Sequence, residues 1–224
     1  MKKALTILFV LVFMCGGFMQ AQLVKSISLT SGMVWATQKF DYKDINYDLP
    51  NEYLTGFHIG FDVEFLQHEY LSILTEIGYT QKGFKLEADI TTHDFPEGGL
   101  GTKVLKYRFS YVYLSPMFKV RKEFGGFVPY IFIGPRLDYL LEYPTDEFSE
   151  ESAKYFNDFI FGMTYGLGIE YMFGSFGVGL IFQNQYDFTL AYHHEMEEGY
   201  DSGVDIKNNA FIVDLGVKYY FGKQ

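Results

Sequence analysis

Large apolar residues alternate with small or polar residues along most of this 224-residue chain. The stretch GFHIGFDVEF, residues 56–65, shows the pattern, with five large apolar residues at every second position from Phe57 onward. Successive side chains of a β-strand point to opposite faces, so a period of two predicts strands with one bulky apolar face and one small, polar face. A helix would mix the two sets of residues and is therefore disfavoured.

The same alternation recurs in eight segments of the chain. Their apolar rows are Ile27, Leu29, Met33 and Trp35; Phe57, Ile59, Phe61, Val63 and Phe65; Leu71, Ile73, Ile77 and Tyr79; Tyr107, Phe109, Tyr111 and Tyr113; Ile131, Ile133, Leu137, Tyr139 and Leu141; Phe159, Phe161, Met163, Tyr165, Leu167, Ile169 and Tyr171; Phe176, Val178, Leu180, Phe182, Tyr186 and Phe188; and Phe211, Val213, Leu215, Val217, Tyr219 and Phe221. Each segment is long enough for a tilted membrane strand of about 9–11 residues. A mean hydropathy near zero disfavours membrane helices.

The direction of the apolar face separates two kinds of barrel. A soluble, lipocalin-like barrel would point the large residues inward, but eight strands leave an interior only just wide enough for side chains. The large faces would overfill that interior, whereas glycines and charged residues fit it. The sequence therefore predicts an all-β fold, an eight-stranded antiparallel up-and-down transmembrane β-barrel whose large residues face lipid.

The opposite face carries charged residues that we expect to fill the lumen as one network. They are Asp62, Glu64, Glu76, Lys82, Arg108, Arg136, Asp138, Glu170, Asp187, Asp214 and Lys218. Buried charges must be paired or hydrogen-bonded, since each unpaired one costs several kcal/mol. Packed together, they would plug the bore. A general-diffusion porin needs about twice as many strands.

Linkers between the predicted strands alternate in length. The short linkers are 66–70, 121–126 and 172–175, and the long ones are 40–52, 87–102, 143–156 and 190–207. Transmembrane barrels have short periplasmic turns and longer outer loops, so the long linkers should face the exterior. Their many acids indicate a solvated loop surface, with weak divalent-cation binding near lipopolysaccharide as the alternative.

The amino terminus is typical of a secretory signal peptide. Lys2 and Lys3 precede an apolar run at 4–14, and small and polar residues follow up to Ala21. We expect cleavage there, which gives a signal peptide at 1–21 and a barrel domain at 22–224. A lipoprotein reading would use Cys15, but bulky residues precede that cysteine. The predicted destination is the bacterial outer membrane, and the net charge of −10 argues against nucleic acid as a partner.

Three prolines fall inside predicted strands, where each removes a hydrogen-bond donor from the ladder. Pro116, Pro129 and Pro135 are therefore expected to sit at β-bulges.

Three strand segments resemble the PorT-type outer-membrane β-barrel family. They are YVYLSPMFKV (111–120), PYIFIGPRLDYLL (129–141) and EIGYTQKGF (76–84), where that family usually reads Y-L-E-I-P, P-Y-x-x-x-G-P and E-L-x-Y-x-x-K-G. The chain differs from the family pattern at Leu114, where the family usually has an acid before the proline. The resemblance implies a small outer-membrane barrel, and some relatives are accessory components of a protein-secretion system. A shared fold does not transfer that role.

The segment DLGVKYYF (214–221) resembles the carboxyl-terminal assembly signal of outer-membrane barrels, polar-x-Gly-x-x-aromatic-x-aromatic. Asp214, Gly216, Tyr219 and Phe221 match it. The resemblance implies the barrel-assembly machinery as a transient partner. An ordinary last strand whose aromatic residues only anchor it is the alternative interpretation.

Candidate catalytic and metal-binding residues are few, and we predict no catalytic, cofactor or metal site. His58 and Ser110 are the only interior candidates, with Asp62 near His58, and a structural role is favoured for His58. His193, His194 and Glu195 are adjacent, so in an extended segment they point to opposite faces and make a poor metal site.

Three functions remain open from the sequence. The first is a non-enzymatic scaffold, adhesion or secretion accessory, in contact with outer-membrane lipid and lipopolysaccharide and with an envelope protein. The second is a narrow channel for ions or small solutes. The third is a membrane-embedded lipid-modifying hydrolase or acyltransferase.

Overall fold

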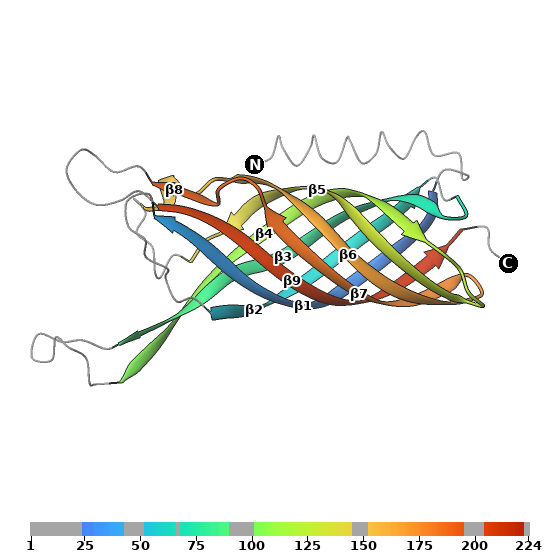
Figure 1. Ribbon diagram of the computed structural model, residues 1–224, viewed down its shortest axis with the longest axis horizontal. Coiled ribbons are helices and arrows are strands. Elements are labelled where there is room, and N and C mark those ends of the chain that lie inside the picture. Colours follow the sequence, from blue (N-terminus) through green and yellow to red (C-terminus); the bar gives the residue numbers. More distant parts are fainter. Residues whose placement is uncertain are drawn as a thin grey trace, which may run out of the picture.

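The computed structural model describes residues 24–42, 52–65, 68–89, 101–144, 152–194 and 204–221. Eight long strands dominate this part of the chain (Figure 1). They are β1 (Val24–Tyr42), β2 (Glu52–Phe65), β3 (Leu71–Asp89), β4 (Thr102–Arg121), β5 (Phe127–Glu142), β6 (Phe159–Phe173), β7 (Phe176–Asp187) and β9 (Val204–Tyr220). A short 3-10 helix, η1 (Ser152–Tyr155), and a three-residue strand, β8 (Tyr192–His194), lie between β5 and β6 and between β7 and β9. Within the described residues, no helix combines the length and apolar character needed to cross a membrane.

The eight long strands form a closed ring. Each pairs antiparallel with the next long strand, and β1 also pairs with β9. Thr30 of β1, for example, lies opposite Gly60 of β2 on one side and Gly216 of β9 on the other. The short strand β8 pairs with the outer end of β9, and its Tyr192 forms an isolated bridge with Phe156, so β8 adds no strand to the ring. The prediction of an all-β, eight-stranded antiparallel up-and-down barrel is therefore confirmed.

Short and long connections lie at opposite ends of the barrel (Figure 1). The short turns join β2 to β3, β4 to β5 and β6 to β7, and the long connections join the other pairs of consecutive ring strands. At the long-connection end, β3 and β4 continue as a two-stranded hairpin that projects past the neighbouring strands (Figure 1). By the rule for transmembrane barrels, this is the extracellular end.

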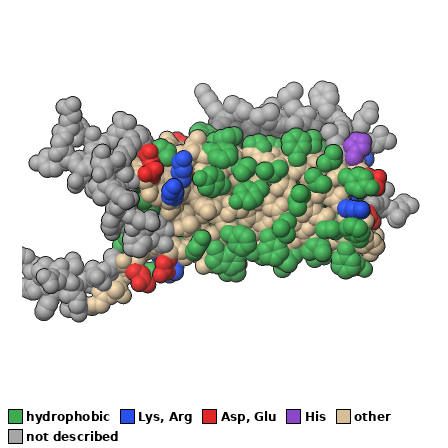
Figure 2. Space-filling view, in the orientation of Figure 1, with side chains coloured by type: hydrophobic (Ala, Val, Ile, Leu, Met, Phe, Trp, Pro, Cys, Tyr) green, Lys and Arg blue, Asp and Glu red, His purple; other side chains and the backbone are tan. Residues whose placement is uncertain are grey.

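Large apolar side chains cover the outside of the barrel, and charged side chains gather at its two ends (Figure 2). The central wall presents exposed aliphatic residues such as Leu167 and Leu215. Aromatic pairs flank it, with Tyr171 against Phe127 at the short-turn end (ring centroids 4.9 Å apart) and further pairs, Tyr139–Phe159 and Trp35–Phe211, at the other end. Aromatic girdles at both interfaces are typical of transmembrane barrels.

The orientation predicted for β4 is wrong. Phe109, Tyr111 and Tyr113 are buried, and the outward row consists of Val112, Leu114 and alternate residues up to position 120. The inward rings fit because glycines stand opposite them: a Cβ added to Gly78 would lie 2.6 Å from the Tyr113 ring. Aromatic residues in this strand therefore fill the lumen instead of facing lipid.

The three prolines do not sit at β-bulges, so the expectation of a bulge at each of them is wrong. The β4–β5 pairing keeps the same register at Leu114↔Leu137 and at Phe118↔Ile133. Pro116 and Pro135 lie between these two pairs, where no ladder pairs are assigned. Pro129 pairs with Ile169 in an unbroken β5–β6 register. Ser115 Oγ donates to the Pro135 carbonyl at 3.0 Å, so a side chain supplies a donor where the backbone lacks one. The register shift of this strand pair lies instead at Ser110 and Tyr111.

Candidate functional site: the polar lumen

The lumen holds almost all of the charged residues that the alternation placed there. Asp62, Glu64, Glu76, Lys82, Arg136, Asp138, Glu170, Asp187, Asp214 and Lys218 are all buried. Arg108 is the exception, because β4 has the opposite orientation: its side chain is exposed and Nη2 donates to the Thr55 carbonyl at 3.3 Å. The same inversion brings Lys119 and Arg121 into the lumen, two bases that the sequence reasoning missed. Their alternation with Phe118 and Val120 was the signal that could have found them.

Glu64 is the centre of the layer nearest the short turns. Its Oε2 lies 3.1 Å from Lys119 Nζ and 2.9 Å from Lys218 Nζ. Its Oε1 accepts from Ser72 Oγ at 2.6 Å and lies 3.7 Å from Arg121 Nη1.

Glu170 is the second carboxylate of this layer. Lys218 Nζ lies 3.2 Å from Oε2, and Tyr220 OH donates to Oε1 at 2.5 Å. Lys119 Nζ also lies 4.1 Å from the centre of the Tyr130 ring, a cation–π distance. Three cations therefore share two carboxylates, and aromatic rings contribute to their stabilisation.

The middle layer is acidic and surrounds His58. Its Nδ1 lies 2.7 Å from Asp214 Oδ1, and its Nε2 lies 2.5 Å from Tyr113 OH and 3.6 Å from Glu76 Oε1. Asp214 also accepts from Gln183 Nε2 at 3.0 Å.

Asp62, the residue expected beside His58, instead accepts from Ser28 Oγ at 2.7 Å. Three carboxylates and one histidine thus occupy the centre of the barrel, each with a hydrogen-bond donor or a cation nearby.

The layer toward the extracellular end is balanced in charge. Lys82 Nζ donates to Asp138 Oδ2 at 2.6 Å, and Arg136 Nε donates to Asp138 Oδ1 at 2.7 Å. Arg136 Nη2 pairs with Asp187, whose other oxygen accepts from Asn208 Nδ2 at 2.8 Å. Two cations and two carboxylates therefore link β3, β5 and β7 across the bore, and Asn208 connects β9 to them.

Aromatic residues cover the network at the extracellular mouth. Phe109, Tyr111, Ile160 and Ala191 form a buried cluster, against which Phe156 packs. Ala191 belongs to the connection between β7 and β9, and its backbone accepts from Asn157 N at 3.0 Å and donates to Ile206 O at 2.7 Å. These hydrogen bonds hold parts of the β5–β6 and β7–β9 connections over the lumen.

The hydroxyl of Tyr192, at the same mouth, has a raised pKa. Burial, followed by the neighbouring Tyr155, raises the pKa of the Tyr192 hydroxyl. The Tyr192 ring packs edge-on against Phe156 with centroids 4.9 Å apart.

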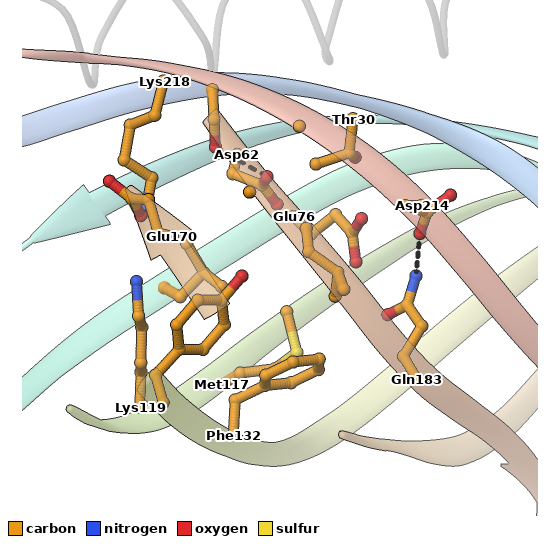
Figure 3. Close-up of a pocket in the computed structure, with 16 residues that line it drawn as sticks. Thr30, Asp62, Glu76, Met117, Lys119, Phe132, Glu170, Gln183, Asp214 and Lys218 are labelled. Atoms are coloured by element: carbon orange, nitrogen blue, oxygen red, sulfur yellow. Dashed lines mark hydrogen bonds and ion pairs between the residues drawn. The ribbon is translucent and has the colours of Figure 1, made fainter. Parts of the chain in front are cut away.

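One cavity inside the barrel lies within the charged network. A cavity of about 30 Å³ lies between the first two layers, lined by Asp62, Glu76 and Lys119 among others (Figure 3). One water molecule needs roughly 10–15 Å³ by this kind of measure. The cavity therefore has room for two or three water molecules and none for a larger solute.

Within the described residues, His58 and Ser110 do not form a base–nucleophile pair. The hydrogen-bond partners of His58 are a carboxylate and a tyrosine, with no serine among them. Ser110 lies elsewhere, 2.9 Å from Tyr79 OH and 3.4 Å from Glu142 Oε2. In the described part of the chain, no group of three or more His, Cys, Asp or Glu side chains is placed to hold a metal ion. The side chains of His193 and His194, and all of Glu195, lie outside the described residues.

The residues of the carboxyl-terminal motif divide between the two faces of β9. Asp214 and Gly216 are buried on the lumen side. Tyr219 and Phe221 are exposed on the outside, with ring centroids 5.2 Å apart. Their part in assembly stays a prediction.

A closed ring of eight strands with an apolar wall and a filled polar lumen defines an integral transmembrane β-barrel protein. Residues 20–195 match the family model described as outer membrane protein beta-barrel domain, more than half of the chain. The chain belongs to that family, and the protein is located in the bacterial outer membrane. No curated protein sequence matches it.

Solved outer-membrane proteins are similar in fold. AlkL, determined by solid-state NMR in DMPC lipid bilayers, has a TM-score of 0.50 and 11% identity, covering 91% of this chain and 92% of its own. OprG from Pseudomonas aeruginosa gives a TM-score of 0.45 and 9% identity over 88% of this chain and 97% of its own. Neisserial surface protein A has a TM-score of 0.45 and 11% identity, covering 87% of this chain and 97% of its own. At these identities the similarity concerns the fold alone.

Proposed function

We propose that this protein is a non-enzymatic accessory or scaffold barrel that presents its extracellular hairpin to a partner in the cell envelope. The observation that carries the proposal is the filled lumen. Three charged layers and an aromatic cover occupy the bore, and the cavity between the first two layers is about 30 Å³. Because side chains occupy the bore, we expect the function to depend on the surfaces of the barrel.

The hairpin of β3 and β4 is the surface we propose for contact. The last described β2 residue in the β3 ladder is Glu52, opposite Lys85, so within the described residues β3 extends beyond its pairing with β2. The β4–β5 ladder begins at Ser110, and among the described residues Thr102 to Lys106 are paired with β3 alone. Free strand edges can accept an extended segment of another chain. The PorT-like motifs support a partner in protein secretion, as an expectation from the resemblance.

Shortening the hairpin tests this proposal. Residues 86–105 would be replaced by Asn-Gly, which favours a tight two-residue turn. After crosslinking in cells, we expect co-purified envelope proteins to be lost from this variant. A matched variant shortened at 195–203 should keep them. Equal partner profiles for the two variants would refute the hairpin as the contact surface. Faster migration of the unboiled protein on a gel checks that each variant folds.

A narrow channel is the second candidate, and the polar lining of the cavity favours it. Purified protein in planar bilayers should show no defined conductance steps if the lumen is closed. Reproducible single-channel steps would support the channel instead. A lipid-modifying enzyme is the third candidate, and unchanged lipid A mass spectra with and without the protein would count against it.

A further inference from the structure

Two cations lie on the outer face of β4 just above the apolar wall. Alternate outward positions from Val120 to Val112 carry only apolar residues. Val112 lies opposite Tyr79, whose hydroxyl is 2.9 Å from Ser110 Oγ, so polar contacts begin at this level. Arg108 is four residues further on, about 13 Å along the strand and about 10 Å along the membrane normal for the usual strand tilt.

These two cations, Arg108 and Lys106, have no acidic partner among the described residues. Both side chains are exposed, and Arg108 Nη2 donates to the Thr55 carbonyl at 3.3 Å. Lys85, opposite Lys106 in the ladder, is by contrast paired with Glu52 at 3.0 Å. A guanidinium has five N–H donors, so most donors of Arg108 remain available.

The position of this pair is suited to a phosphorylated lipid. Lys106 and Arg108 are two residues apart on β4, so both side chains point outward from the same face, about 6.6 Å apart along the strand. Arginine and lysine are the usual ligands of phosphoryl groups. The apolar row at Val112, Leu114 and Phe118 continues below them on the same face. A glycolipid could therefore place its acyl chains against this row and its phosphates at the two cations.

We propose that Lys106 and Arg108 bind the phosphoryl groups of lipopolysaccharide in the outer leaflet. Continuity with the apolar wall favours a lipid over free phosphate, which would gain nothing from that wall. The same continuity favours a lipid over a protein partner, for which we propose the strand edges of the hairpin. Lys106 and Arg108 lie on that hairpin, but the variant that replaces 86–105 by Asn-Gly keeps both residues, so either proposal can fail alone.

Native mass spectrometry of the full-length folded protein in detergent tests the site. The probes are deep-rough lipopolysaccharide, the same lipopolysaccharide after dephosphorylation, and inorganic phosphate. We expect the variant carrying Lys106→Gln and Arg108→Gln to bind intact lipopolysaccharide about tenfold more weakly, from two exposed charge contacts. Dephosphorylated lipopolysaccharide should bind the wild type about as weakly. Millimolar inorganic phosphate should not displace the intact lipid.

Two matched variants control the measurement. Lys103 is exposed on the other face of the same hairpin, so Lys103→Gln should leave binding within twofold of wild type. The exchange Lys106→Arg with Arg108→Lys keeps both charges and should keep binding. Unchanged binding by the double glutamine variant, equal loss in Lys103→Gln, or equal binding of dephosphorylated lipid would each overturn the proposal. Displacement by inorganic phosphate would also overturn it, by assigning the site to a free anion.

Discussion

Substitution of Glu64 by glutamine should destabilise the barrel more than any other single charge-neutralising change near the short turns. Glu64 is 1% exposed and its carboxylate contacts Lys119 at 3.1 Å, Lys218 at 2.9 Å and Arg121 at 3.7 Å. Glutamine keeps the volume but removes the charge. Lys218 would retain its ion pair with Glu170, whereas Lys119 would lose its ion pair with Glu64 and keep the Tyr130 ring and the more distant charge of Glu170.

The expected loss follows from the cost of leaving buried charges uncompensated. Removing one partner of a buried ion pair typically costs about 3–5 kcal/mol of folding free energy. The fluorescence of Trp35, the single tryptophan of the chain, can follow urea unfolding of the protein in lipid vesicles. The free energy of unfolding should fall by about 3–5 kcal/mol in Glu64→Gln.

A control at the same end separates burial from charge. Glu123 is half-exposed and lies 3.9 Å from Arg121 Nη2, so Glu123→Gln should cost less than about 1 kcal/mol. Adding Lys119→Met to Glu64→Gln should recover part of the loss, because one uncompensated cation is removed. A loss below about 1 kcal/mol for Glu64→Gln would refute the view that these charges are effectively buried.

Three further expectations test the wall, the lumen and the last strand. Leu167→Arg, on the lipid-facing wall, should lower the free energy of unfolding by about 2–4 kcal/mol in vesicles, and a near-zero effect would mean that this position is not in the bilayer. Gly78→Ala should lower the midpoint of urea unfolding because the new Cβ meets the Tyr113 ring, and adding Tyr113→Ala should relieve that clash; a lack of rescue would contradict the contact. Phe221→Ser should slow membrane insertion and leave protease-sensitive periplasmic chain in a pulse-chase experiment, whereas deletion of 222–224 should not. Normal insertion with only a lower unfolding temperature would leave Phe221 as an anchor.

The wall of the barrel could be predicted from the sequence because lipid imposes one simple rule on every second residue. In β6 and β9 the outward rows are where the alternation placed them. The rule failed in β4 because both of its faces carry large residues: tyrosines on one side and aliphatic residues on the other. Aromatic residues were assigned to lipid, and the bases Lys119 and Arg121 were consequently missed.

The lumen contacts could not be predicted, because they depend on which strands face each other across the bore. His58 and Asp214 are far apart in sequence, and only ring closure and register bring them to 2.7 Å. The room beside the glycines could not be predicted either, because it also depends on the facing strands. A Cβ added at Gly162 would collide with the Tyr186 carbonyl and the Arg136 guanidinium.

The pairing of β1 with β9 has a consequence for biosynthesis. It runs from Ser26↔Tyr220 to Tyr42↔Val204, so the first strand to be made finds its second neighbour only when the last one exists. A chain that stops before β9 would expose two unpaired strand edges, which is costly in hydrocarbon. Premature termination should therefore yield no partial product in the membrane. We therefore expect chains truncated before β9 to stay outside the membrane, where periplasmic proteases can degrade them.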